Sequence, residues 1–236
     1  MKTVRCFIAI ECPGEIEEDI LKIQQELKIA LGAMPNTPPP PIRLKGTREA
    51  DKHGGMDGPD RLGIRWVRPA GFHLTLKFLG NVPQERLSGI VEVVGKVTPS
   101  IPPFMVSVSG IGVFPNAQDP RVLWIGVRSV GDDLVRLQEG IEEGLEPLGF
   151  ACEGRSFHPH FTLGRLKSFG GTRRQVDSRP AREVLVKWIA QNEQRECGRF
   201  EVKEVLLMKS DLKPGGAVYT PLATVGLGVR KREAVK

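Results

Sequence analysis

A short phrase of histidine, apolar residue, threonine and apolar residue occurs twice in the chain. The first copy is His73-Leu74-Thr75-Leu76 and the second is His160-Phe161-Thr162-Leu163. In an extended strand successive side chains alternate faces, so each phrase presents an imidazole and a hydroxyl on one face and two apolar anchors on the other. Two of the chain's four histidines hold the same place in the phrase. The repeat therefore predicts one site with two proton-transfer groups, one acting as base and one as acid.

The residues near the second phrase indicate phosphoryl chemistry. Imidazoles with an ordinary pKa of about 6.5 exchange protons at neutral pH, and the hydroxyls of Thr75 and Thr162 can donate hydrogen bonds to phosphate oxygens. Arg165 lies an odd number of residues after His160, so it can clamp a phosphate only if the strand bends, for which Gly164 is suitable. A surface ion pair is the alternative for Arg165.

The sequence has no carboxylate cluster with metal-ligand spacing and no Gly-rich phosphate loop of the P-loop type. Metal-free phosphoryl chemistry suits this inventory best. A metal site would have to join His73, His158 and His160 without an acidic ligand, which makes it a poor alternative.

Composition predicts a globular protein with anionic partners. Charged residues make up 26% and hydrophobic residues 40% of the 236 residues, and the net charge of +6 with a pI near 9.3 favours phosphate-bearing ligands. Four cysteines lack Cys-x-x-Cys spacing, which indicates free thiols in a reducing cytosol. Because no run of about 18 apolar residues occurs, we expect a cytoplasmic protein without a membrane partner.

Hydrophobic periodicity predicts the same order of elements twice: strand, helix, strand with the phrase, helix, strand. The expected strands are 4–10, 64–67, 72–79, 104–112, 121–128, 156–166, 200–209 and 217–225, and the expected helices are 16–31, 83–97, 132–148 and 181–194. Residues 33–63 read as a surface insertion, or as a basic flap built from Arg43, Lys45, Arg48 and Lys52.

This order predicts an α+β fold in one domain, residues 1–236. We expect a bilobal pseudo-two-fold duplication in which each lobe is an antiparallel sheet with helices on its outer face, around a central cleft. The first lobe spans roughly residues 1–115 and the second roughly 116–236, with strand exchange between the lobes as an open alternative.

The two phrases, with the segments around them, resemble the 2H phosphoesterase superfamily and, more closely, the bacterial and archaeal RNA 2′,3′-cyclic phosphodiesterases, long called 2′-5′ RNA ligases. The resemblance extends over most of the chain. It rests on Arg5 to Ile10, Trp66 to Pro69, His73 to Gly80, Gly112 to Pro115, Pro120 to Trp124, Phe157 to Arg165 and Tyr219 to Leu222. The insertion at 33–63 is longer than expected for the family.

The resemblance implies hydrolysis of an RNA terminal 2′,3′-cyclic phosphate to a 2′-phosphomonoester, without a cofactor, and in reverse a 2′-5′ ligation. It implies that His73 donates a proton to the 3′ oxygen and that His160 activates water, although symmetry permits the swap. Thr75, Thr162 and Arg165 would hold the phosphate, while His158 supports the strand. The expected partner is RNA with a cyclic phosphate end, tRNA fragments included, bound by a monomer.

Two alternatives stay open at this stage. An enzyme of the same superfamily could act on small cyclic nucleotides instead of RNA ends. A non-catalytic RNA-end-binding module could instead use Trp66, Phe72 and Phe114 as platforms for base stacking.

Overall fold

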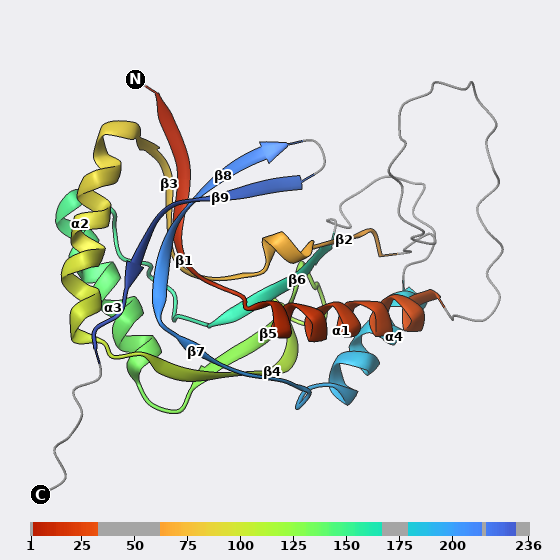
Figure 1. Ribbon diagram of the computed structural model, residues 1–236. Coiled ribbons are helices and arrows are strands. Elements are labelled where there is room, and N and C mark those ends of the chain that lie inside the picture. Colours follow the sequence, from red (N-terminus) through yellow and green to blue (C-terminus); the bar gives the residue numbers. More distant parts are fainter. Residues whose placement is uncertain (1, 33–61, 167–178, 214–215, 230–236) are drawn as a thin grey trace, which may run out of the picture.

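The computed structural model describes residues 2–32, 62–166, 179–213 and 216–229, and the following holds for those residues. Nine strands form one antiparallel sheet, and four α-helices accompany it (Figure 1). The strands are β1 (Thr3–Glu11), β2 (Ile64–Trp66), β3 (His73–Pro83), β4 (Phe104–Phe114), β5 (Val122–Ser129), β6 (His160–Leu166), β7 (Glu196–Val202), β8 (Glu204–Lys213) and β9 (Gly216–Gly226). The helices are α1 (Gly14–Gly32), α2 (Leu87–Val97), α3 (Asp133–Leu145) and α4 (Arg179–Gln191).

The sheet is duplicated about its centre. Its strand order is β7-β4-β5-β6-β3-β1-β8-β9, and β2 pairs with β6 beside β3. The pair β1 and β3 in one half corresponds to β5 and β6 in the other, and each half places two further strands outside this pair. The predicted α+β class with an antiparallel, duplicated architecture is confirmed.

Sheet neighbours cross the boundary predicted near residue 115. Strand β4 comes from the first part of the chain but pairs with β5 and β7, whereas β8 comes from the end of the chain and pairs with β1. The assignment of residues 1–115 and 116–236 to two lobes stays a prediction.

The helices cover one face of the sheet and leave the other open. They pack as two pairs, α1 with α4 and α2 with α3, at separate ends of the molecule (Figure 1). In α1 the residues at helical spacing, Ile16, Ile20, Ile23, Leu27 and Leu31, are all buried. They join one large hydrophobic core with the inward-facing residues of the strands. We call the other side of the sheet the open face.

Most predicted elements are found within a few residues of their expected bounds, with two corrections. The strand predicted over 156–166 begins only at His160, after Pro159, which has no N–H to donate to a ladder. The single strand predicted over 200–209 is two strands, β7 and β8, which lie in opposite halves of the sheet. The chain passes from one half of the sheet to the other at Lys203 and Glu204. Both residues are exposed, which interrupts the alternation of buried and exposed side chains. The insertion predicted at 33–63, with its basic flap, lies outside the described residues apart from its last two.

Candidate active site

The two phrases lie side by side at the centre of the sheet. Strands β3 and β6 run antiparallel and pair at Leu74 and Phe161, both fully buried on the core face. In this register His73 is next to Thr162, and Thr75 is next to His160, all on the open face. The pairing therefore brings two imidazoles and two hydroxyls into one diagonal group, where they can surround a single small anion.

The same irregularity occurs in both halves and reorients the end of each phrase. On β1 and β3, Ile8 pairs with Lys77 and Ala9 with Thr75, so Leu76 is an extra residue. On β5 and β6, Leu123 pairs with Gly164 and Trp124 with Thr162, so Leu163 is extra. A β-bulge of this kind shifts the alternation by one residue. Arg165 consequently shares the open face with Thr162 and His160, although its odd offset would put it on the core face in a regular strand.

Gly164 is required at this bulge because β2 packs directly on it. A Cβ added there would lie 2.7 Å from Cγ2 of Ile64 and 3.4 Å from a ring carbon of Trp66. The corresponding residue of β3 is Lys77, on which no such strand lies. The bend in the strand that Arg165 needs to reach the open face is therefore present next to Gly164. Glycine is needed there because a side chain would collide with Ile64.

His160 has a defined hydrogen bond behind its ring. Its Nδ1 lies 2.6 Å from the carbonyl oxygen of His158, and because a carbonyl only accepts, Nδ1 carries the proton. Nε2 is then the nitrogen with a free lone pair. Burial lowers the pKa of His160, and the hydrogen bond to His158 partly opposes this, while the charge of Arg165 lowers the pKa further. The ring is therefore neutral at neutral pH.

His73 is held in the same manner, two residues after its hydrogen-bond partner. Its ring bonds to the backbone of Gly71, but burial lowers its pKa to about 4, with smaller contributions from the charges of Arg165 and His160. Because the charge of Arg165 lowers the pKa of both histidines, its guanidinium lies near both imidazole rings. Both imidazoles are thus neutral at neutral pH, and a bound anion would favour their protonated forms.

Aromatic rings fix the histidines from the sides. Phe7 and Tyr219 each lie 4.7 Å from the His73 ring, measured between centroids, and Tyr219 meets it edge-on. Phe114 lies 5.1 Å from the His160 ring, also edge-on. Beside His73 a small hollow opens between Glu11, Glu17, Phe72 and the side chains of β8. These contacts restrict rotation of both imidazole rings and fix the direction in which their nitrogens point.

A buried glutamine of α1 holds the bulge in β6. Gln24 is 3% exposed, and its Nε2 donates to the carbonyl oxygens of Leu163 (2.8 Å) and Val67 (2.9 Å). Leu163 is the extra residue of the bulge, so this side chain reaches the backbone irregularity that turns Arg165. The sequence contained a signal for Gln24, a polar residue within the apolar stripe of a helix, but it was not among the predicted site residues.

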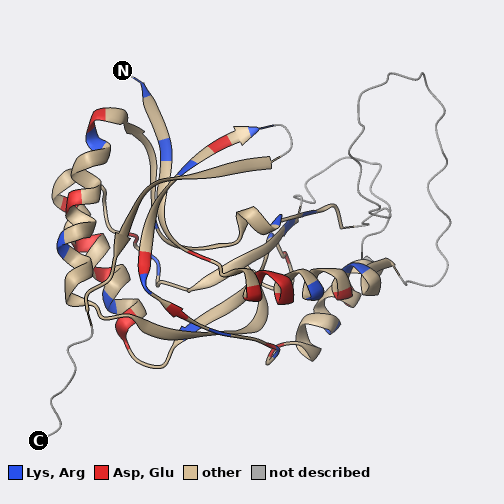
Figure 2. Cartoon of the chain, viewed as in Figure 1, with Lys and Arg blue, Asp and Glu red and all other residues tan. Residues whose placement is uncertain are grey.

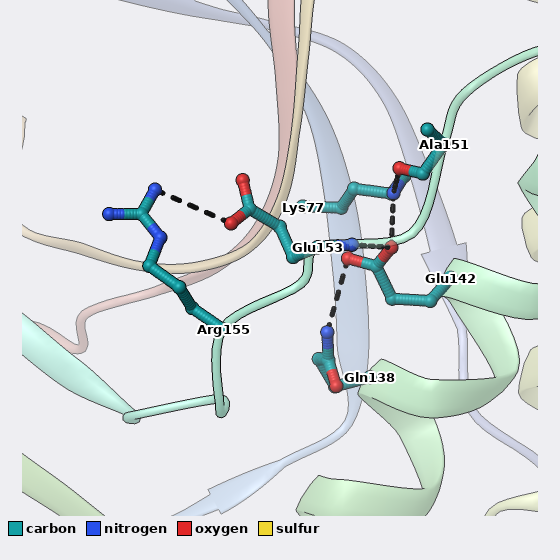
Figure 3. Close-up of polar contacts among 6 residues, drawn as sticks. All are labelled: Lys77, Gln138, Glu142, Ala151, Glu153 and Arg155. Atoms are coloured by element: carbon teal, nitrogen blue, oxygen red, sulfur yellow. Dashed lines mark hydrogen bonds and ion pairs between the residues drawn. The ribbon is translucent and has the colours of Figure 1, made fainter.

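A buried ion pair supports the corresponding bulge in β3. Lys77, on the core side of the sheet, forms an ion pair with Glu142 of α3 and also donates to the carbonyl oxygen of Ala151 at 2.9 Å (Figure 3). Glu142 further accepts from the backbone N–H of Glu153 and from Gln138 Nε2, both at 3.2 Å. This network joins β3 to the segment that leads into β6. Lys77 lies inside the first phrase region, yet periodicity alone gave no indication of its partner.

Of the three predicted stacking platforms, Phe72 lies in the core and Trp66 is partly buried against it. Phe72 is 3% exposed and Trp66 packs against the same core, beneath Lys28 of α1. Phe114 does lie beside His160 and Trp124. His158 contributes its carbonyl to His160 and packs its ring on Trp124, in agreement with a supporting role.

The described ranges contain neither a cluster of metal ligands nor a membrane-spanning helix. In residues 2–32, 62–166, 179–213 and 216–229, no three His, Cys, Asp or Glu side chains gather closely enough to hold a metal ion. Over the same ranges no helix has the length and apolarity needed to cross a bilayer.

Two His-x-Thr strands that meet on one face of a duplicated antiparallel sheet define the two-histidine class of phosphoesterases. Comparison with known proteins agrees. The family model described as "LigT like Phosphoesterase" matches residues 55–124 and again residues 125–219. Each of the two matches contains one copy of the phrase. The chain belongs to the LigT-like phosphoesterase family.

Individual relatives cover almost the whole chain. A protein of Methanocaldococcus jannaschii named RNA 2′,3′-cyclic phosphodiesterase is 31% identical over 216 residues, covering 92% of this chain and 96% of that protein. A protein of the same name from Methanothermobacter thermautotrophicus is 35% identical over 219 residues, covering 93% and 96%.

Solved structures share the fold. The protein TT0787 of Thermus thermophilus is 26% identical with a TM-score of 0.65, covering 96% of this chain and 100% of its own. The E. coli LigT structure complexed with 3′-AMP is 24% identical with a TM-score of 0.64, covering 96% and 99%, and indicates a common fold.

Proposed function

We propose that this protein is a metal-independent RNA 2′,3′-cyclic phosphodiesterase that opens a terminal cyclic phosphate to a 2′-phosphomonoester. The observation that carries the proposal is the diagonal group of His73, Thr75, His160 and Thr162 at the pairing of β3 and β6. Relatives at 31% and 35% identity over almost the whole chain bear the name of this activity. The basic net charge of +6 suits a polyanionic substrate.

The proposed reaction is an in-line displacement at phosphorus by water. Nε2 of His160, which has the free lone pair, takes a proton from water as the new P–O bond forms. The bond from phosphorus to the 3′ oxygen breaks, and His73 donates a proton to that oxygen. The products are a 2′-phosphomonoester and a free 3′-hydroxyl. The same displacement with a 5′-hydroxyl in place of water would form a P–O5′ bond, break the bond to the 3′ oxygen and yield a 2′-5′ linkage.

The remaining residues would stabilise the phosphate. Thr75 and Thr162 donate hydroxyl hydrogen bonds to its non-bridging oxygens, and Arg165 neutralises the charge that grows on these oxygens in the transition state. Burial lowers the pKa of both imidazoles, so neither ring carries an extra proton at neutral pH without help. The negative charge of the substrate would raise the pKa of the ring that serves as the acid and so allow it to hold a proton.

An assay with an RNA oligonucleotide that ends in a 2′,3′-cyclic phosphate tests the proposal. We expect wild-type protein in excess EDTA to convert it to the 2′-phosphate, and His73→Ala or His160→Ala to reduce kcat by at least about 10²-fold, the lower range for loss of a general acid or base. Thermal unfolding of each variant checks that the fold is intact.

The contrary outcomes separate the alternatives. Activity that disappears in EDTA and returns only with added metal would contradict metal independence. Either single variant within tenfold of wild type would reject the paired acid and base. Binding of the oligonucleotide without product formation would instead favour the RNA-end-binding module, and turnover restricted to cyclic mononucleotides would favour the small-nucleotide enzyme.

A further inference from the structure

Two arginines lie directly opposite each other beside the candidate active site. Arg65 of β2 pairs with Arg165 of β6 in an antiparallel register, so both side chains are on the same face. Both are exposed, whereas the preceding Ile64 in β2 and the following Leu166 in β6 are buried in the core. Figure 2 shows basic positions, in blue, in the region where β2 lies beside β6. They continue the row of His160 and Thr162 along the open face.

Like charges placed opposite each other in a ladder destabilise a sheet unless an anion lies between them. Beyond the backbone pairing of β2 with β6, the side chains of Arg65 and Arg165 form no ion pair or hydrogen bond within the part of the chain that the structure describes. Arg121, the neighbouring arginine before β5, differs because Asp119 accepts from it at 2.8 Å. Asp119 therefore neutralises Arg121, whereas the side chains of Arg65 and Arg165 are available for an external anion.

The backbone that carries Arg65 is held firmly. Val67 N–H donates to the carbonyl oxygen of Leu163 at 2.9 Å, and the Gln24 side chain bonds both carbonyls at this junction. Ile64 packs on Gly164. These contacts order the backbone of β2 before any ligand binds. Binding of an anion by Arg65 therefore does not have to offset the entropy of ordering that short strand.

We propose that Arg65, beside Arg165, binds the phosphodiester next to the terminal cyclic phosphate, so that the protein prefers an RNA strand over a cyclic mononucleotide. This inference rests on the proposed function. Arg165 lies between the reacting group and Arg65, at about two strand steps, or roughly 7 Å, from Thr162. It can face the reacting phosphate, while Arg65 faces the next one. A guanidinium is suited to such a contact because it binds phosphate oxygens in a bidentate manner.

The test compares a dinucleotide with a terminal cyclic phosphate, which has one internal phosphodiester, with a 2′,3′-cyclic mononucleotide, which has none. We expect wild-type protein to prefer the dinucleotide. Arg65→Ala should lower kcat/KM for the dinucleotide by at least about tenfold, the smaller end of what a hydrogen bond to a charged group contributes, and change the mononucleotide value less than twofold. Its mononucleotide activity also shows that the variant is folded.

Three controls make the result specific. A dinucleotide with a neutral methylphosphonate linkage should lose the wild-type preference and should be insensitive to Arg65→Ala. The slope of log(kcat/KM) against log salt for the dinucleotide should fall by about 0.7 in the variant. Arg136→Ala, an exposed arginine of α3 on the helix side, should change neither preference nor slope.

Equal effects of Arg65→Ala on both substrates, or equal wild-type rates for both, would overturn the inference while leaving the proposed function intact. If wild-type protein hydrolyses neither substrate, the proposed function itself fails. The two failures are therefore distinguishable.

Discussion

At the scale of single residues, the proposed chemistry depends on how the protein sets the pKa values of two imidazoles that hold equivalent places in the sequence. Each ring bonds to the backbone two residues earlier, at Gly71 for His73 and at His158 for His160. Burial lowers both pKa values, that of His73 to about 4. A general acid must carry a proton, so the ring that donates it depends on the substrate anion to raise its pKa. Symmetry alone does not say which ring this is.

A substrate with sulfur in place of the 3′ oxygen decides between the two rings, because a thiolate leaves without protonation. We expect the sulfur substrate to restore His73→Ala to within about tenfold of wild type and to leave His160→Ala inactive, since the acid's contribution of about 10² to 10⁴ is no longer needed. For wild type, the loss of rate as pH rises through the pKa of the acid should also disappear. Rescue of His160→Ala instead of His73→Ala would reverse the assignment.

At the scale of elements, the two β-bulges determine which side chains reach the site. In β6 the extra residue is Leu163, and Gln24 of α1 bonds its carbonyl oxygen at 2.8 Å. Without the bulge, Arg165 would lie on the core face with Phe161 and Leu163. A helix residue far away in sequence thus contacts the backbone that orients Arg165, the residue proposed to bind the phosphate.

Replacement of this glutamine should disturb Arg165 specifically. We expect Gln24→Leu to lower the free energy of unfolding by about 1–3 kcal/mol, because two buried carbonyls lose a donor, and also to lower kcat/KM. In a double-mutant cycle with Arg165→Ala, the kinetic effects should not add, because the glutamine acts through the arginine. The cycle is read from kcat/KM and inhibition by inorganic phosphate.

Gln138→Leu provides the matched control. Gln138 is a buried glutamine of α3 that donates to Glu142 at 3.2 Å, so its loss should cost stability without coupling to Arg165. If Gln24→Leu and Arg165→Ala were fully additive in kcat/KM, the positioning role of Gln24 would be wrong, and a purely structural role would remain.

At the scale of the whole molecule, the sheet ties the two halves of the chain together. Strand β4 pairs with β5 and β7, and β8 pairs with β1, so the halves exchange strands in both directions. The Lys77–Glu142 pair adds a buried polar link between β3 and α3 (Figure 3). Removal of one half would leave buried strand edges and a buried charge of the other without partners.

This topology predicts that neither half folds alone. A fragment of residues 1–115 should show no cooperative thermal transition, because β1 lacks β8 and Lys77 lacks Glu142. Coexpression with a fragment of residues 116–236 should restore a folded, active complex. A fragment 1–115 that unfolds cooperatively by calorimetry and circular dichroism would contradict this prediction and would support independent lobes.

The repeated phrase and the periodicity of its surroundings were sufficient to predict much of this protein. The α+β class, the duplication, the helices and most strands follow from the spacing of apolar residues, because burial of one face imposes a period on local sequence. The sequence also predicts the candidate site residues, because polar and apolar side chains alternate within each phrase. These residues are His73, Thr75, His160 and Thr162.

Tertiary structure alone decided how distant segments combine. The bulges that turn Arg165, the partners Gln24 and Glu142, the exchange of β4 and β8, and the pairing of Arg65 with Arg165 all join residues far apart in the chain. Such pairings depend on register and on packing between elements, and a one-residue shift reverses the face that a side chain takes. Local periodicity contains no information about that register, so the sequence could name the chemical groups but not the neighbours that orient them.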